Sequence, residues 1–230
     1  MTALAPLRPC ASLHRCSSRA RSVVPSPTPS PRRRLVHSTS PAPPRTYLYD
    51  VDWNGQLYLS DSKHRNVATA FRDPRFLDVF FSRLRRNDAD EGQGEARRLR
   101  ADGYEFVSPC QGEMNYLRPD REGSGLVFQA LEQGELRYAG SLSLPFDPQA
   151  LRVDTASGYL FHPSPTSSRR RGDAPSRYGP YSLLRSSLVV EHFAKSLELD
   201  EGGEGTFEYE GERHRIEPLQ EGDVWRRQDL

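Results

Sequence analysis

The amino-terminal end of this chain limits the part that can fold. Residues 1–49 hold no Asp or Glu, and the first acidic residue is Asp50. The same stretch carries eight Arg, eight Ser and nine Pro. A segment of this composition cannot bury enough apolar surface to offset the entropy lost on ordering, so we expect it to be unfolded. The folded part is expected to begin near Arg45 and to end near Leu219.

An organellar import signal has this composition. Transit peptides are rich in Arg and Ser and poor in acids, and a membrane potential that is negative inside draws such peptides inward. Residues 32–40 resemble a mitochondrial processing region, with basic residues before a Leu and small hydroxyl residues. We therefore expect a protein of the mitochondrial matrix, with a chloroplast address as the alternative. A disordered basic tail that binds nucleic acid or membrane is the remaining interpretation.

The predicted mature chain is mildly acidic. Removal of residues 1–38 lowers Lys and Arg from 32 to 25 against 31 Asp and Glu, which changes the net charge from +1 to about −6. That charge does not favour a phosphate backbone, so nucleic acid is not an expected partner. No stretch approaches the roughly 18 apolar residues of a transmembrane segment. Cys110 alone remains after loss of Cys10 and Cys16, which excludes a disulfide within one mature chain.

Alternating strands and an amphipathic helix open the predicted fold. Residues 47–52 and 56–59 have the character of strands, and Asn54-Gly55 suits a two-residue hairpin turn between them. Asp73-Pro74 is typical of a helix start. The helical stripe that follows is Phe76, Leu77, Phe80, Phe81 and Leu84. A polar, exposed loop is expected over residues 87–103. Further strands are expected over residues 104–108, 115–117, 125–131 and 135–142.

The second half repeats this predicted pattern. A hairpin is expected over residues 151–161, with Asp154 in the position of Asp52 of the first hairpin. A Ser, Pro and Arg loop (163–180) then precedes a second amphipathic helix, marked by Leu183, Leu184, Leu188, Val189, Phe193 and Leu197. A closing hairpin is expected over residues 206–216. We predict an α+β fold of two similar units, each a mostly antiparallel sheet packed by a helix.

The predicted boundaries follow from that repeat. They are a transit peptide and linker (1–44), an N-terminal α+β unit (45–145), a C-terminal α+β unit (146–219) and a tail (220–230).

Much of the folded part resembles a known family. The string VDWNGQLYLSDSKHRNVATAFRDPRFLDVFFSRLRRN resembles the signature of eukaryotic uncharacterised protein family 0598. FVSPCQGEMNYLR, LPFDPQAL followed by GYLFHP, and LLRSSLVVEHF support the resemblance. Members of that family are predicted mitochondrial proteins without an established reaction. The layout is more distantly similar to bacterial family of unknown function 1285, which implies two related α+β domains and a role in sensing small molecules.

Common catalytic and cofactor motifs are absent from the sequence. It has neither of the common phosphate-binding Gly loops and no HExxH, CxxC or GxSxG. The mature histidines are His64, His162, His192 and His214, and no two are spaced as ligands on one helix or strand. We therefore predict no metal site and no cofactor.

Cys110 is the candidate nucleophile. A catalytic thiol needs a base or cation nearby, and Glu113 and Asn115 would share one side of the strand that follows. The favoured interpretation is a buried, small apolar residue at a strand end. A thiol-dependent or acid–base enzyme centred on these three residues is thus an alternative function, and we do not predict catalysis.

Candidates for ligand binding lie on the segment after the first hairpin. They are Asp61, Lys63, Arg65, Asn66 and, further along the chain, Arg118. The segment combines both charge signs with an amide, and loops on a rigid scaffold often carry ligand sites. Lys63 and Arg65 could clamp a carboxylate or phosphate. The alternative is a solvated turn whose side chains satisfy backbone amides.

The leading function is therefore a non-catalytic matrix protein that binds a small anionic metabolite or a protein partner. A third possibility is an assembly factor that contacts mitochondrial RNA or the ribosome through Arg169-Arg170-Arg171.

Overall fold

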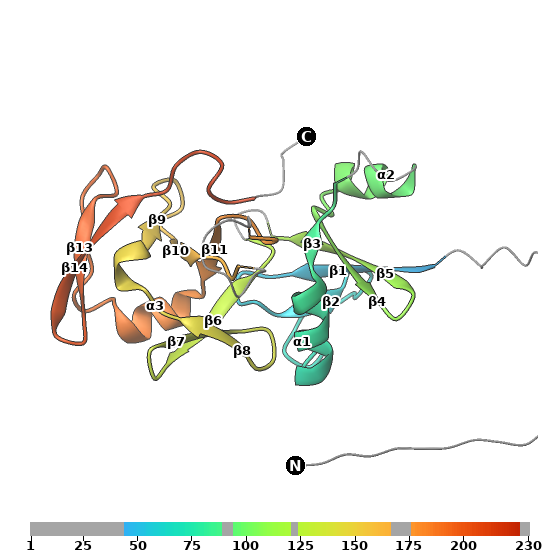
Figure 1. Ribbon diagram of the computed structural model, residues 1–230, viewed down its shortest axis with the longest axis horizontal. Helices are drawn as coiled ribbons and strands as arrows, with labels where there is room; N and C mark the ends of the chain where they lie inside the picture. Colours follow the sequence, from blue (N-terminus) through green and yellow to red (C-terminus); the bar gives the residue numbers. More distant parts are fainter. Residues whose placement is uncertain (1–43, 89–93, 121–123, 167–175, 226–230) are drawn as a thin grey trace, which may run out of the picture. The chain divides into compact units, whose positions relative to one another are not determined.

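The computed structural model describes residues 44–88, 94–120, 124–166 and 176–225 (Figure 1). All of them belong to one compact unit, Ala42–Leu230. The predicted transit peptide and linker lie outside the described residues except for Pro44, as do Arg169-Arg170-Arg171 and residues 226–230 of the tail. None of the described helices is long and apolar enough to cross a membrane.

The fold is α+β, and its first sheet has the strand order β2-β1-β5-β4-β3. These strands are β1 (Arg45–Val51), β2 (Leu57–Leu59), β3 (Arg85–Arg86), β4 (Phe106–Cys110) and β5 (Glu113–Pro119). β1 runs antiparallel to β2 and parallel to β5. The predicted opening hairpin is confirmed, since Tyr49 faces Leu59 and Val51 faces Leu57 across it. Its turn is not the predicted two-residue turn, because residues 53–55 connect Asp52 to Gln56 and only Gly55 of the pair Asn54-Gly55 has a positive φ.

The second sheet has the order β12-β13-β14-β9-β10-β11-β6-β7-β8. Its strands are β6 (Val127–Glu132), β7 (Glu135–Tyr138), β8 (Leu142–Pro145), β9 (Arg152–Val153), β10 (Leu160–Pro163), β11 (Tyr181–Leu184), β12 (Glu198–Leu199), β13 (Gly205–Tyr209) and β14 (Glu212–Pro218). Strands β6, β7 and β8 were predicted in the N-terminal unit, and they are hydrogen-bonded to this sheet through β11.

Helix α1 (Pro74–Arg83) begins where the sequence predicts. The Asp73 carboxylate accepts hydrogen bonds from the backbone N–H groups of Arg75 at 2.8 Å and Phe76 at 3.1 Å. Phe80 is fully buried and meets Tyr49 of β1 edge to face, with ring centroids 5.2 Å apart. Burial of each such ring stabilises the contact of helix and sheet by roughly 1.5–3 kcal/mol. The other helices are α2 (Glu95–Ala101), the short 3-10 helix η1 (Pro148–Ala150) and α3 (Ser186–His192).

The segment 87–103 is not the exposed loop that was predicted, because it contains α2. Ala96 and Leu99 pack against a cluster of Tyr104, Val107 and Tyr116. By strand alternation this cluster lies on the face of the first sheet opposite α1. Seven residues complete only about two helical turns. Two apolar side chains over so short a length do not establish a helical period in the sequence.

The second predicted helix begins later than expected. α3 starts at Ser186, whereas Leu183 and Leu184 belong to β11. Leu183 pairs with Val127 of the parallel strand β6. The two leucines fit helical spacing and fit a buried strand equally well, and the long-range pairing decides between them.

Five strands of the second sheet follow the order of the first sheet. The order β10-β9-β14-β13-β12 matches β2-β1-β5-β4-β3, strand for strand. The parallel pair in each set joins a valine to a proline. Val51 faces Pro119 in the first sheet, and Val153 faces Pro218 in the second.

Candidate functional site

Two predicted ligand-binding residues meet at an aspartate that was not predicted. Asp50 lies on β1 and is 3% exposed, and Arg118 lies opposite it on β5. Arg118 donates to the Asp50 carboxylate from Nε to Oδ1 at 2.7 Å and from Nη2 to Oδ2 at 3.1 Å. Arg65 donates to the same carboxylate through Nη2. The sequence signal for this cluster was an acidic residue within an aromatic strand, because a carboxylate that is buried there needs cationic partners.

This arrangement commits both arginines to Asp50. The hydrogen bond from Arg118 to Asp50 is the main cause of the raised pKa of Arg118. The Arg118 guanidinium also lies 4.9 Å from the ring centre of Tyr104. A free anion would compete with a carboxylate that already holds these donors in a forked, charge-assisted geometry. The cluster therefore fits a structural role better than an anion clamp.

The other loop candidates do not join this cluster. Asp61 and Lys63 are exposed. The Asn66 side chain accepts hydrogen bonds through Oδ1 from the backbone N–H groups of Ala68 at 2.9 Å and Thr69 at 3.2 Å. Asn66 thus stabilises its own turn, as the alternative interpretation of this segment proposes.

The three residues of the enzyme alternative lie together at the β4–β5 hairpin. Cys110 pairs with Glu113, and Ser108 pairs with Asn115. The Asn115 amide donates to the Ser108 carbonyl at 3.0 Å, so its hydrogen-bonding capacity is used within the hairpin. The Ser108 hydroxyl lies 3.3 Å from the Cys110 sulfur and donates to the carbonyl of Phe80 in α1 at 2.7 Å. This geometry connects the thiol to the packing of α1.

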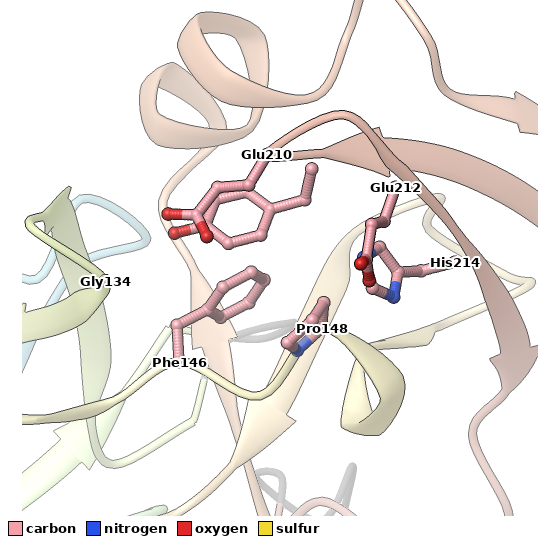
Figure 2. Close-up of a pocket in the computed structure, with 7 residues that line it drawn as sticks. Gly134, Phe146, Pro148, Glu210, Glu212 and His214 are labelled. Carbon is pink, nitrogen blue, oxygen red and sulfur yellow. The ribbon is translucent and has the colours of Figure 1, made fainter.

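A cavity of about 310 Å³ lies beside the β13–β14 hairpin (Figure 2). It is lined by Gly134, Phe146, Pro148, Tyr209, Glu210, Glu212 and His214. The hairpin turns at Glu210 and Gly211, whose φ angles are 51° and 82°, and this turn sets Tyr209 opposite Glu212. Figure 2 shows the side chains of Phe146, Pro148 and Glu212 gathered around one space.

The inner face of β14 is polar at its tip. Every second residue of β14 points to the same face, which therefore carries Glu212, His214 and Ile216. Ile216 is fully buried, and so is Phe207, which pairs with His214 and lies 5.5 Å from its imidazole between ring centroids. The face that forms the core at one end of β14 therefore carries a carboxylate and an imidazole at the other end.

A second cavity of about 810 Å³, here called the groove, shares Phe146 and Pro148 with the first. Its lining residues are Tyr138, Ser143, Leu144, Pro145, Phe146, Asp147, Pro148, His162, Pro163, Ser164, Pro165 and Thr166. Proline and aromatic side chains make up much of its wall. Ligand sites have this composition, with a few polar groups set among apolar ones.

His162 forms a fixed part of the groove wall. It is 2% exposed, and its Nε2 accepts the backbone N–H of Asp147 at 3.0 Å. The proton therefore lies on Nδ1, which donates to the carbonyl of Pro163 at 3.0 Å. Burial lowers the pKa of His162 to about 4. The imidazole is neutral at physiological pH and positions the backbone on both sides of the groove.

None of the residues that line these cavities was a candidate from the sequence. His162 and His214 were considered only as metal ligands. Over the described ranges no group of three or more His, Cys, Asp or Glu is arranged to hold a metal ion. The available signal was the proline-rich connection after β8, where aromatic and acidic residues interrupt the strand pattern.

Comparison with known proteins places the chain in a family. No solved structure matches it. The family described as a domain of unknown function (DUF4505) matches residues 38–220, which agrees with the expectation of an uncharacterised family. The match includes every strand of both sheets and both cavities. The chain thus belongs to the DUF4505 family, whose function is unknown.

Proposed function

We propose that this protein is a non-catalytic binding module whose groove holds an extended segment of a protein partner. The observation that carries the proposal is a buried hydroxyl in the groove wall. Ser164 is 5% exposed, Ser182 is fully buried, and their hydroxyl oxygens lie 2.6 Å apart. One hydrogen bond between two hydroxyls uses only one of their two protons.

We assign the second hydroxyl proton to Ser164, on the side of the groove. Ser182 is enclosed, so donation by Ser182 to Ser164 leaves no donor stranded in the core. Ser164 lines the groove, and its own proton then points toward an acceptor there. In the described part of the chain neither hydroxyl makes another hydrogen bond. A peptide carbonyl is an acceptor that suits this position.

Strand β8 adds a backbone edge to the same groove. It is the last strand of the second sheet, and the N–H of Phe146 points inward to the carbonyl of Gly134 at 2.8 Å. Backbone groups alternate along a strand, so those of Ser143 and Pro145 point away from the sheet. A segment laid along β8 can bond to the outward groups of Ser143, a known mode of peptide recognition.

The anionic ligand of the leading sequence prediction is less well supported. Arg65 and Arg118 already neutralise Asp50. Lys63 is exposed, and the arginine that was expected to form an anion clamp with it, Arg65, is bound to Asp50. The protein partner is therefore the half of that prediction which the geometry favours.

A blocked groove tests the proposal. Peptides selected from a random display library on the full chain would be measured by fluorescence anisotropy. Ser143→Arg places a long side chain on an exposed groove residue without changing the backbone donors of β8, and we expect it to weaken binding at least about tenfold. Gln149→Arg adds the same side chain to an exposed residue of η1 outside the groove lining and is the control. Failure to select any peptide, or equal affinity in both variants, would contradict the proposal.

We also propose that the protein works in the mitochondrial matrix. The acid-free, Arg-rich stretch before Asp50 supports this location. Sequencing the amino terminus of the protein isolated from mitochondria tests it. A mature terminus near residue 38 is expected, and an intact Met1 would contradict import with cleavage.

We further propose that the two matching sets of five strands arose by duplication of one unit. Besides the shared strand order, aspartates occupy equivalent turns. The backbone N–H of Asp52 bonds to the Gln56 carbonyl at 3.1 Å, and that of Asp154 to the Tyr159 carbonyl at 2.9 Å. Superposition of the two sets tests the idea. It would be contradicted if Val51 and Val153 did not coincide.

A further inference from the structure

We infer that the cavity of Figure 2 recognises a cationic side chain, arginine or lysine, carried by the segment that occupies the groove. This inference rests on the proposed function, because the cavity and the groove share Phe146 and Pro148. The two cavities are therefore adjacent.

Aromatic rings form the apolar part of the cavity wall. The rings of Phe146 and Tyr209 meet edge to face with centroids 5.0 Å apart, and Phe193 stacks on Phe146 from the core side at 5.6 Å. Fixed rings of this kind present negative faces to which an ammonium or guanidinium group is attracted. A planar guanidinium can stack on such a ring while its N–H groups reach carboxylates.

The polar part of the wall is anionic. Glu210 and Glu212 both line the cavity, and within the described residues neither forms a salt bridge. The arginines of the same hairpin lie on its other face, where Arg213 pairs with Glu198 at 2.8 Å and Arg215 pairs with Glu204 at 2.6 Å. The hairpin thus keeps its own cations away from the two carboxylates that face the cavity.

Tyr209 joins the aromatic and anionic parts. Burial and the neighbouring Glu210 carboxylate raise the pKa of Tyr209, so its hydroxyl keeps its proton at physiological pH. A protonated tyrosine adds no negative charge but orients Glu210 at the cavity rim. The two glutamates therefore supply the negative charge that attracts a cation, and the aromatic rings determine the shape of the cavity.

Discrimination between charged and neutral isosteres tests this inference. The probes are the peptides Ac-Ala-Leu-Arg-Leu-Ala-NH₂ and Ac-Ala-Leu-citrulline-Leu-Ala-NH₂, titrated into the ¹⁵N-labelled full chain and followed by NMR. Citrulline keeps the shape of arginine and removes its charge. We expect the arginine peptide to bind about tenfold more tightly, since a charge-assisted bond exceeds a neutral one by roughly 1.4 kcal/mol. Its titration should shift resonances of both Ser164 and Glu212.

Two glutamates of one hairpin provide the matched variants. Glu212→Gln should abolish the preference for arginine, whereas Glu208→Gln, an exposed residue on the outer face of β13, should retain it. Equal affinity for the two peptides with shifts at Ser164 would overturn the inference and leave the groove proposal standing. A preference that survives in Glu212→Gln would also overturn it. If neither peptide shifts any groove or cavity resonance, both proposals fail.

Discussion

The hairpins β4–β5 and β13–β14 occupy the same place in their sheets and differ in what their tips do. Both turn through two residues of nearly identical geometry. Gln111 and Gly112 have φ angles of 50° and 82°, and Glu210 and Gly211 have 51° and 82°. Cys110 faces Glu113 at the first tip, as Tyr209 faces Glu212 at the second. The predicted thiol site and the cavity of Figure 2 are therefore equivalent positions.

The difference lies in the hydrogen bonds behind each tip. In the first hairpin Ser108 bonds to the Phe80 carbonyl of α1 and Asn115 bonds to Ser108. In the second, the equivalent residues are Phe207 and His214, which meet ring to ring. The polar groups of the first tip form hydrogen bonds within the fold. Those of the second face a cavity, which is where a binding function can reside without loss of stability.

The two sheets also carry an ion pair at equivalent positions, with the acidic and basic residues exchanged between the strands. Asp50 and Arg118 pair across β1 and β5, whereas Arg152 and Glu217 pair across β9 and β14 at 3.3 Å. The Asp50 side chain is 5% exposed, and that of Glu217 is 50% exposed. The same position therefore holds a buried charge cluster in one sheet and a solvated pair in the other.

The largest expected effect separates these ion pairs. Asp50→Asn removes the charge of a buried carboxylate that accepts three hydrogen bonds from arginine, and we expect it to lower the free energy of unfolding by roughly 3–5 kcal/mol. Glu217→Gln should cost less than about 1 kcal/mol, because a half-exposed pair is solvated. Urea unfolding at neutral pH measures both. Similar losses in the two variants would break the comparison.

Acid should destabilise the second sheet through His162. Its folded pKa of about 4 lies below the unfolded value of 6.5, so its contribution to stability is complete above pH 6.5 and is lost as the pH falls to about 4. The expected loss from this residue is about 3 kcal/mol. An amide can accept from Asp147 and donate to Pro163, so His162→Gln should flatten the dependence of unfolding free energy on pH. If the unfolding free energies of the wild type and His162→Gln depend on pH in the same way, His162 is not a neutral, buried imidazole.

A smaller effect should distinguish the two tips. Asn115→Ala leaves the buried Ser108 carbonyl without its side-chain donor, at an expected cost of roughly 1–3 kcal/mol. His214→Ala removes a half-buried ring at the edge of a cavity, and its cost is expected to be below about 1 kcal/mol. Thermal and urea unfolding compare the pair. A costlier His214→Ala would mean that the second tip is structural as well.

The smallest effect is expected at the thiol. Cys110→Ser preserves the contact with the Ser108 hydroxyl, so the free energy of unfolding should change by at most about 0.5 kcal/mol. Mapping of iodoacetamide labelling by mass spectrometry then examines reactivity, with slower alkylation expected in the folded chain than in urea. Rapid alkylation of folded Cys110 at neutral pH would instead favour the enzyme alternative.

Local patterns predicted much of the secondary structure. The strand around Tyr49, the opening hairpin and the start of α1 at Asp73 each depend on a few neighbouring residues, and each is confirmed. Helix α2 and the start of α3 were not predicted, since short apolar runs fit more than one element.

The site was harder to predict because distant segments form it. Arg65 and Arg118 were identified as candidates from their charge, but the Asp50 that joins them required knowledge of the pairing of β1 with β5. The cavity depends on the approach of Phe146 to the β13–β14 hairpin. Neither contact leaves a periodic signal in the sequence, and sequence spacing alone could not reveal it.

Pro145 has a consequence for the behaviour of the protein at high concentration. Exposed sheet edges promote self-assembly, because a regular row of N–H and C=O groups can be extended from molecule to molecule. At the outer side of β8 that row is interrupted after Ser143, since Pro145 has no N–H to donate. A strand of an identical chain therefore meets one backbone donor fewer along β8 than along an uninterrupted edge strand.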